Sequence, residues 1–141
     1  MYQDEKECFI LKGIPGSGKS TTARTIAGEN GKVHEADSYH YNDEGVYDFK
    51  FENLGKAHAQ CLAQFKESIL AGTLRVVQSN TNTTLKAYKE YMKFAREHGY
   101  RVTVMTVENH HGGKNIHGVP EAALVKMENE LKNSMHLRYQ G

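Results

Sequence analysis

Apolar residues recur along the chain in two alternating patterns: short runs, and longer stretches in which they stand three or four positions apart. The short runs predict buried strands, and the spaced stretches predict amphipathic helices. The predicted strands span residues 6–12, 32–36, 74–78 and 101–107. The predicted helices cover residues 19–28, run from 51 to Gly72 and from 85 to Gly99, and begin again at Pro120.

Strands that alternate with helices predict a parallel sheet with right-handed crossovers, covered by helices on both faces. At 141 residues, the chain has room for one such domain and little for another. No internal repeat or interdomain linker interrupts the pattern. We therefore expect a single α/β domain over residues 1–141.

Composition limits the cellular compartments in which such a domain is expected. Hydrophobic residues are 38% and charged residues 25% of the chain, as in ordinary globular proteins. No stretch approaches the roughly 20 apolar residues that cross a bilayer, and residues 1–8 (MYQDEKEC) lack the apolar core of a signal peptide. Cys8 and Cys61 are too few for a disulfide framework and fall at predicted core positions. We expect a cytoplasmic protein without membrane contact.

Residues 13–21 read GIPGSGKST, between the first predicted strand and the first predicted helix. This G-x-x-x-x-G-K-S pattern predicts a loop whose backbone N–H groups hold the phosphates of ATP, because glycine permits their close approach. Lys19 would reach the β- and γ-phosphates, and Ser20 would coordinate Mg²⁺. The nucleotide-binding residues predicted here are Gly13, Pro15, Gly16, Ser17, Gly18, Lys19, Ser20 and Thr21. The fold class is thus an α/β P-loop NTPase (kinase-like), with a parallel sheet of about four strands.

Asp37 directly follows the second predicted strand, so it should lie at the carboxyl edge of the sheet beside the glycine loop. A carboxylate at this position can accept the proton of a hydroxyl that attacks the γ-phosphate. The alternative is that Asp37 only caps the next helical turn.

The segment after the third strand reads QSNTNTT (78–84) and contains no acid. A common P-loop hydrolase places an acid there to hold magnesium. The uncharged groups of Asn80, Thr81 and Asn82 suit recognition of an acceptor's phosphate or sugar, or else a capped turn before the next helix.

Residues 108–119 (ENHHGGKNIHGV) form a polar loop with paired glycines, predicted to be a lid over the triphosphate. Closure of this lid would exclude water and so favour transfer over hydrolysis. One alternative is a merely solvated loop. Another is a zinc site on its histidines, but no carboxylate or cysteine stands at helical spacing to fix the geometry, so we expect no zinc.

The ordered motifs are similar to those of the P-loop polynucleotide kinase family. They are GxPGSGKST, D-x-Y after the second strand, S-N-T-N after the third, and K-N-I-H-G-V-P before the last helix. The family includes the bacteriophage 5'-hydroxyl polynucleotide kinase domain and related ubiquitin-ligase-binding P-loop kinase-like proteins. The resemblance spans essentially the whole chain, and the ordered set is more specific than the glycine loop alone.

The resemblance implies roles for individual residues. Asp37 corresponds to the general base, and Lys19 and Lys114 to groups that stabilise the transferring phosphate. Lys114 and Asn115 occupy the lid position of an R-N pair that contacts the nucleotide. The predicted substrate-binding residues are Asp37, His40, Asn80, Thr81 and Asn82, the last three falling on a D/N-T-N motif. A Y-x-F…L…A-H stretch, interpreted as packing, corresponds to Tyr47, Phe49, Leu54, Ala57 and His58.

Two positions depart from the family pattern. His40 stands where the phage enzyme has an arginine three residues after its base, and Lys114 replaces the lid arginine. Lysine keeps the charge but loses the bidentate fork, and histidine is charged only part of the time near neutral pH. These changes predict weaker transition-state stabilisation or a different acceptor.

We therefore predict an ATP-dependent kinase that transfers the γ-phosphate to a hydroxyl, with the 5'-hydroxyl of a polynucleotide as the leading acceptor. A net charge of +1 argues against a protein that coats long duplexes but permits one that binds the end of a single strand. Two alternatives stay open: a kinase for a nucleoside or other small metabolite, and an ATP-binding interaction module with little catalysis.

Overall fold

The computed structural model describes residues 5–14, 17–108, 125–127 and 129. Within the glycine loop, Pro15 and Gly16 lie outside these ranges. So do the predicted lid beyond Glu108 and most of the predicted last helix. In the described part, no helix has both the length and the apolar character needed to span a membrane.

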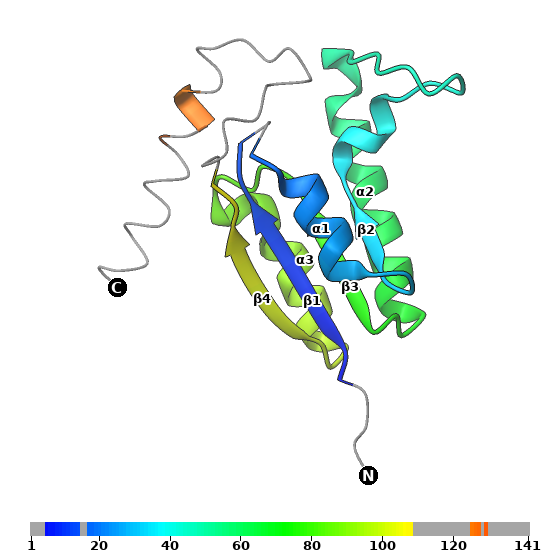
Figure 1. The fold of residues 1–141 in the computed structure, drawn as a ribbon, viewed down its shortest axis with the longest axis vertical. Coiled ribbons are helices and arrows are strands. Elements are labelled where there is room, and N and C mark those ends of the chain that lie inside the picture. The colour runs from blue at the N-terminus through cyan, green and yellow to red at the C-terminus, as the bar shows by residue number, and fades with distance from the viewer. Residues whose placement is uncertain (1–4, 15–16, 109–124, 128, 130–141) are drawn as a thin grey trace.

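Four strands form one parallel sheet, which confirms the predicted topology (Figure 1). The strands are β1 (Glu7–Lys12), β2 (Lys32–His34), β3 (Arg75–Ser79) and β4 (Arg101–Thr106). Their order in the sheet is β2-β3-β1-β4, so β1 lies between β3 and β4. All four carboxyl ends therefore lie at one edge, where ligands bind in open α/β sheets.

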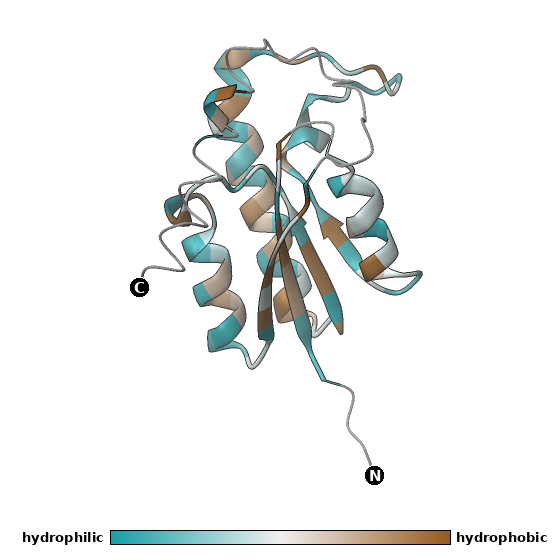
Figure 2. Ribbon diagram, turned by 60° about the vertical axis from the view of Figure 1, so that its left-hand side comes forward, coloured by the Kyte–Doolittle hydropathy of each residue, from teal (hydrophilic) through white to brown (hydrophobic). Residues whose placement is uncertain are grey.

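Helices cover both faces of this sheet, as the alternation of elements predicts. They are α1 (Lys19–Ala27), α2 (Leu54–Leu70) and α3 (Leu85–Glu97). Successive side chains of a strand point to opposite faces, so Ile10 of β1 packs on the α2 and α3 side and Leu11 packs on the α1 side. Figure 2 shows hydrophobic strands between helices whose outer surfaces are largely hydrophilic.

The larger core cluster lies between the sheet and helices α2 and α3. Phe65 of α2 and Tyr91 of α3 meet edge to face, with ring centroids 5.0 Å apart, over the fully buried Ile10 and Val76. Cys61 is buried in this cluster and unbonded to another cysteine. The core placement predicted for it is confirmed.

Two predicted elements differ at their ends. Strand β2 ends at His34, and the 3₁₀ helix η1 (Ala36–His40) follows. The Ala36 N–H donates to the side chain of Asn80, in the loop after β3, so it is not available for a further hydrogen bond between β2 and β3. Helix α2 begins at Leu54 after the 3₁₀ helix η2 (Phe51–Asn53), and Phe51, expected to start the buried face of this helix, is 80% exposed.

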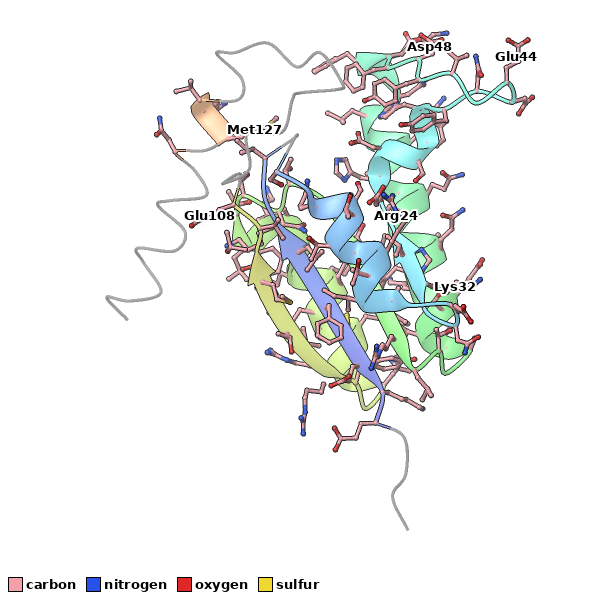
Figure 3. All side chains as sticks on the ribbon, in the orientation of Figure 1. Arg24, Lys32, Glu44, Asp48, Glu108 and Met127 are labelled. Atoms are coloured by element: carbon pink, nitrogen blue, oxygen red, sulfur yellow. The ribbon has the colours of Figure 1, made fainter. Side chains whose placement is uncertain are left out.

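Residues 41–50 connect the two 3₁₀ helices as a folded projection. Tyr41 and Tyr47 form an antiparallel bridge, and the Asn42 side chain accepts bonds from the N–H groups of Glu44 and Val46. Figure 3 shows Glu44 and Asp48 on this projection, away from the sheet. The sequence pattern predicts only that the segment is polar and rich in turns.

Candidate functional site

The phosphate loop connects the end of β1 to the start of α1. Gly18 precedes the helix with φ of 90°, a conformation that favours glycine. A Cβ built on Gly13 would stand 2.6 Å from the Val107 carbonyl oxygen and 2.8 Å from Ser17 Oγ. Only glycine therefore fits at position 13, and the loop has the tight backbone that phosphate binding requires.

Lys19 is the first residue of α1, and its stem passes close to Gly13. Burial lowers the pKa of Lys19, and the negative charges of Asp37 and Glu35 act in the opposite direction. The acids offset only part of the effect of burial, so a phosphate anion beside this ammonium would stabilise its charged form further. The structure thus brings Asp37 into the electrostatic environment of Lys19, at the edge where both are expected.

Ser20 and Thr21 follow Lys19 in the first turn of α1, with exposed side chains. One hydroxyl suits Mg²⁺, which is usually bound by few protein ligands together with nucleotide phosphates and water. The described residues contain no group of three or more histidines, cysteines and acids that could hold a metal alone. The exposed Ser20 hydroxyl is thus chemically suited to a magnesium ion that nucleotide phosphates also bind, and its role as ligand stays a prediction.

Asp37 is the second residue of η1 and is exposed at the carboxyl end of β2. The Tyr47 hydroxyl lies 3.5 Å from Asp37 Oδ1, which is a long contact. Burial, and then the charge of Asp37, raises the pKa of Tyr47 to about 12. Tyr47 therefore stays protonated and can only donate to the carboxylate at neutral pH.

Asn80 holds the element from which Asp37 projects. Its Oδ1 accepts a bond from the Ala36 N–H at 2.8 Å, and its Nδ2 donates to Cys61 Sγ at 3.7 Å. The Asn80 amide thus joins β3's end, the start of η1 and helix α2. This geometry gives Asn80 a positioning role next to Asp37, beside the acceptor contact predicted from sequence.

Asn82 ties the same loop to β1. It is 2% exposed and has a positive φ of 49°. Its Nδ2 donates to the Leu11 carbonyl at 2.7 Å and to Gln78 Oε1 at 2.6 Å, and Gln78 Nε2 donates back at 3.1 Å. Nothing in this placement supports the predicted substrate contact of Asn82, whose amide braces the interior.

Residues 80–82, here named the bridging loop, therefore join the two sides of the site. The Gly13 N–H donates to the Thr81 carbonyl at 3.1 Å, while Asn80 holds Ala36. These two hydrogen bonds link Gly13, through the bridging loop, to Ala36, the residue before Asp37. Sequence reasoning singled out these residues but did not predict the bonds between them.

His40 faces away from the solvent at this edge. Its ring is 4% exposed, 4.8 Å from the Phe49 ring and 5.9 Å from the Tyr47 ring, centroid to centroid. Among the residues that the structure describes, its Nδ1 finds no hydrogen-bond partner. An aromatic enclosure gives His40 a packing role, and its placement lends no support to the predicted substrate contact.

Lys12 is a buried cation next to the phosphate loop that sequence reasoning did not single out. It ends β1 just before the phosphate loop and is fully buried, with Nζ 5.4 Å from the centre of the Tyr88 ring. The signal was a lysine at the end of an apolar strand, where burial is unusual for this residue type. Lys114 and Asn115, by contrast, lie outside the described residues and stay predictions.

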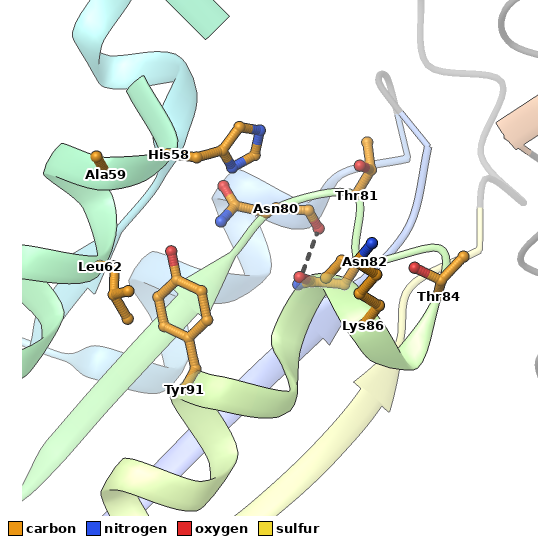
Figure 4. A pocket seen from close by; sticks show the side chains of 10 residues that line it. His58, Ala59, Leu62, Asn80, Thr81, Asn82, Thr84, Lys86 and Tyr91 are labelled. Carbon is orange, nitrogen blue, oxygen red and sulfur yellow. Dashed lines mark hydrogen bonds between the residues drawn. The ribbon is translucent and has the colours of Figure 1, made fainter. Parts of the chain in front are cut away.

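A pocket of about 480 Å³ lies beside the bridging loop (Figure 4). Helix α2 forms one side, and α3 with the residues before it forms the other. The His58 ring and the Asn80 amide point toward one another, and the Tyr91 hydroxyl rises between Leu62 and Asn80. The lining residues are His58, Ala59, Leu62, Asn80, Thr81, Asn82, Thr84, Lys86, Ala87 and Tyr91. Of the stretch interpreted as packing, His58 is therefore a pocket residue.

Comparison with known proteins places this geometry in a wider group. Residues 9–111 match a family model described as an AAA domain, AAA_33. An alignment 127 positions long, which covers 84% of the chain, is 31% identical to human (Homo sapiens) NEDD4-binding protein 2. The chain spans only 7% of that relative's length.

Solved structures resemble the fold at low sequence identity. A chain of the Pnkp1/Rnl/Hen1 RNA repair complex matches with a TM-score of 0.69 and 18% identity, over 96% of this chain and 47% of that one. The Mycobacterium tuberculosis APS kinase CysC matches with a TM-score of 0.53 and 12% identity, over 92% and 99%. Together with the four-stranded parallel sheet, these matches show an α/β P-loop NTPase fold. The chain belongs to the AAA_33 family of AAA domains, a P-loop polynucleotide kinase-like family.

Proposed function

We propose that the protein is an ATP-dependent phosphotransferase that moves the γ-phosphate to the 5'-hydroxyl of a polynucleotide. The observation that carries this proposal is the joint position of Asp37 and Lys19: both lie at the carboxyl edge, and the Asp37 charge acts on the Lys19 ammonium. Phosphoryl transfer needs a positioned base and a cation at the migrating phosphate, and little other protein chemistry.

In the proposed reaction, the acceptor oxygen attacks the γ-phosphorus and its proton passes to the Asp37 carboxylate. The bond from the γ-phosphorus to the β–γ bridging oxygen breaks, and ADP leaves with that electron pair. Lys19, and Lys114 from the lid, offset the charge on the transferring group. Mg²⁺ supplies further charge neutralisation when bound, and Ser20 would hold it.

The polynucleotide acceptor is supported by two observations. The ordered motifs resemble the polynucleotide kinase family, and the fold matches chains of two Pnkp1/Rnl/Hen1 structures, one of them an RNA repair complex. The residues that bind ATP do not by themselves discriminate among acceptors. The choice of acceptor is therefore tested by transfer and not by ATP binding.

The test is transfer of label from γ-labelled ATP to a 5'-hydroxyl oligonucleotide by the wild type and by Asp37→Asn. Loss of a general base should lower the transfer rate about 10²- to 10⁴-fold, while ATP affinity stays within about twofold. Asp43→Asn, an exposed acid on the neighbouring projection, is the matched control. Equal rates for wild type and Asp37→Asn would remove the base assignment.

A second candidate, a kinase for a small metabolite, is favoured by one comparison. The solved chain of the APS kinase CysC is matched over 99% of its length, so this architecture can support a kinase whose acceptor is not a polynucleotide. A screen of nucleosides and small hydroxyl compounds with labelled ATP separates the two. Product from a small hydroxyl compound, and none from oligonucleotides, would select it.

A third candidate is a nucleotide-binding interaction module. The named relative is a NEDD4-binding protein, and the projection at 41–50 exposes Tyr41, Val46 and Phe49 to solvent, a pattern found at protein contacts. This candidate predicts ATP binding without product for any acceptor. Turnover that depends on Asp37 would eliminate it.

A further inference from the structure

We propose that the pocket between α2 and α3 holds the terminal nucleotide of the acceptor strand, with the base against α2 and the 3'-side phosphate at Lys86. The inference rests on the proposed function, since it names the subsite for that reaction's acceptor. It assigns a binding role to His58, Tyr91 and Lys86, side chains that no sequence motif selects for it.

The first argument is position. Asn80 lines the pocket and also bonds the Ala36 N–H, one residue before Asp37. Thr81 lines it as well, and its carbonyl accepts the Gly13 N–H of the phosphate loop. The pocket wall is thus continuous with both the base and the phosphate loop.

The second argument is the chemistry of the α2 side. Ala59 and Leu62 supply apolar surface, and the imidazole of His58 faces the cavity (Figure 4). Tyr91 adds the part of its ring that reaches the cavity, and burial raises the pKa of its hydroxyl, which stays protonated and already bonds the Cys61 thiol. Flat apolar and aromatic surfaces with a few donors suit a nucleobase.

The third argument is charge. The ten residues that line the pocket include no carboxylate, and Lys86 is their one permanent cation. Lys86 is the second residue of α3, so the positive end of that helix adds to its own charge. An anionic group is therefore favoured on the α3 side, and a cationic ligand is disfavoured.

The fourth argument is size. A volume of about 480 Å³ falls within the range of small-ligand pockets, roughly 300–1,000 Å³. This is enough for one nucleotide but not for several, so the rest of the strand would lie outside. The pocket then selects a nucleotide end over a small sugar, because a small sugar leaves the apolar side uncovered.

The experiment titrates three probes into the full chain with Mg²⁺ and a non-hydrolysable ATP analogue: thymidine 3'-monophosphate, thymidine and inorganic phosphate. Calorimetry gives affinity, and amide NMR shifts locate the site. We expect the nucleotide to bind tightest, with shifts at His58, Asn80 and Ala87. Lys86→Ala should weaken nucleotide binding about tenfold or more and leave thymidine unchanged. Lys89→Ala, an exposed lysine on the same helix, should bind like the wild type.

A second pair of variants fills the pocket without touching the core. Ala59→Phe places a ring in the pocket, and Ala63→Phe places the same ring on an exposed part of α2 outside it. We expect Ala59→Phe to block nucleotide binding and Ala63→Phe to leave it intact. Both carry the same change of side chain in the same helix, so a general loss of folding would affect them alike.

The outcomes separate this inference from the proposed function. Transfer to an oligonucleotide that is unaffected by Lys86→Ala and Ala59→Phe would overturn the subsite and leave the kinase. Nucleotide binding at the pocket without any transfer would support the subsite and remove the kinase. Shifts that map elsewhere, no measurable nucleotide binding, or equal binding of inorganic phosphate and nucleotide, would overturn the subsite.

Discussion

The phosphate-loop side and the Asp37 side of the site are built in different ways. On the first, function resides in backbone: Gly13 and Gly18 allow a tight turn, and Lys19 projects from the first turn of one helix. All these residues lie within one short segment of the chain, residues 13–19. On the second side, Asp37 is held by a side chain 43 residues later in sequence, Asn80. Local sequence therefore specifies the first side, and tertiary bonds specify the second.

The two sides also handle buried cations differently. Burial lowers the pKa of Lys19, but Asp37 and Glu35 counteract it. Burial also lowers the pKa of His34, to about 4, and the positive charge of Lys32 adds to the effect. Lys19 thus has two acids that oppose the effect of burial on its pKa, whereas His34 has a cation that adds to it and stays neutral as part of the frame. The pKa values of Lys19 and His34 therefore depend on different neighbours. Mutations on one side of the site should change the charge state of one group and leave that of the other unchanged.

The largest effect is expected on the phosphate-loop side. Lys19→Ala removes a charged donor from the triphosphate and should lower ATP affinity about 10²- to 10³-fold, with transfer falling at least as much. Isothermal titration with ATP and Mg²⁺ measures the affinity. Arg24→Ala, a cation in the last turn of the same helix, should change it less than about twofold. If Lys19→Ala retained its ATP affinity, the assignment of Lys19 as a phosphate-binding residue would be wrong.

The next effect concerns the brace between the sides. Asn82→Ala leaves the Leu11 carbonyl and Gln78 without their buried partner and should lower the free energy of unfolding by about 2–4 kcal/mol. Asn82→Gly loses the same bonds but accepts the positive φ, so it should be about 1 kcal/mol more stable than Asn82→Ala. Urea unfolding measures both. A loss below about 0.5 kcal/mol in Asn82→Ala would mean that the brace is not needed.

A smaller, more selective effect is expected at Asn80. Asn80→Ala frees the Ala36 N–H, so hydrogen exchange at that amide should accelerate and transfer should fall about tenfold to a hundredfold. ATP affinity should stay within about twofold, because the phosphate loop keeps its own bonds. Asn80→Asp retains an acceptor for Ala36 and is the matched control. Equal exchange at Ala36 in both variants would deny Asn80 its positioning role.

Much of the fold could be predicted because the signals were local. The apolar runs and glycine stops gave four parallel strands and the helices between them, and the glycine loop lies where its motif requires. Two element ends differ from the prediction, the end of β2 at Ala36 and the start of α2 at Phe51. Ala36 is bonded to a residue distant in sequence, and Phe51 is exposed to solvent. Neither is visible in a local pattern, which reports periodicity and not partners.

The candidate site was predicted less completely for the same reason. A motif identifies Asn80 and Asn82, but their different roles follow from which way each amide points in three dimensions. His40 reads as a polar residue near the base, and only the tertiary packing of Phe49 and Tyr47 encloses it. Lys12 and the pocket residues on α3 carry no motif, and His58 stands in a stretch that sequence reasoning interprets as packing. Such side chains come together through the crossing of helices and strands, which sequence spacing alone does not define.

The smallest effect tests whether the Asp37 side depends on a neutral histidine. His34 Nε2 lies 2.8 Å from Ser68 Oγ and so joins β2 to α2. The unfolded chain takes up this proton near pH 6.5, and the folded chain only near pH 4, so acid favours unfolding between these values. Stability from this group is full above about pH 6.5 and is lost as the pH falls toward 4.

We expect His34→Gln to remove this part of the acid sensitivity while keeping a neutral bond to Ser68. Between pH 7 and pH 4.5, the wild type should lose about 1–2 kcal/mol more unfolding free energy than His34→Gln. Urea unfolding of both proteins at the two pH values measures the difference, and acids common to both chains cancel in it. An equal loss would show that His34 is already solvated, and the contrast between the frame of the Asp37 side and the balanced charge of Lys19 would then disappear.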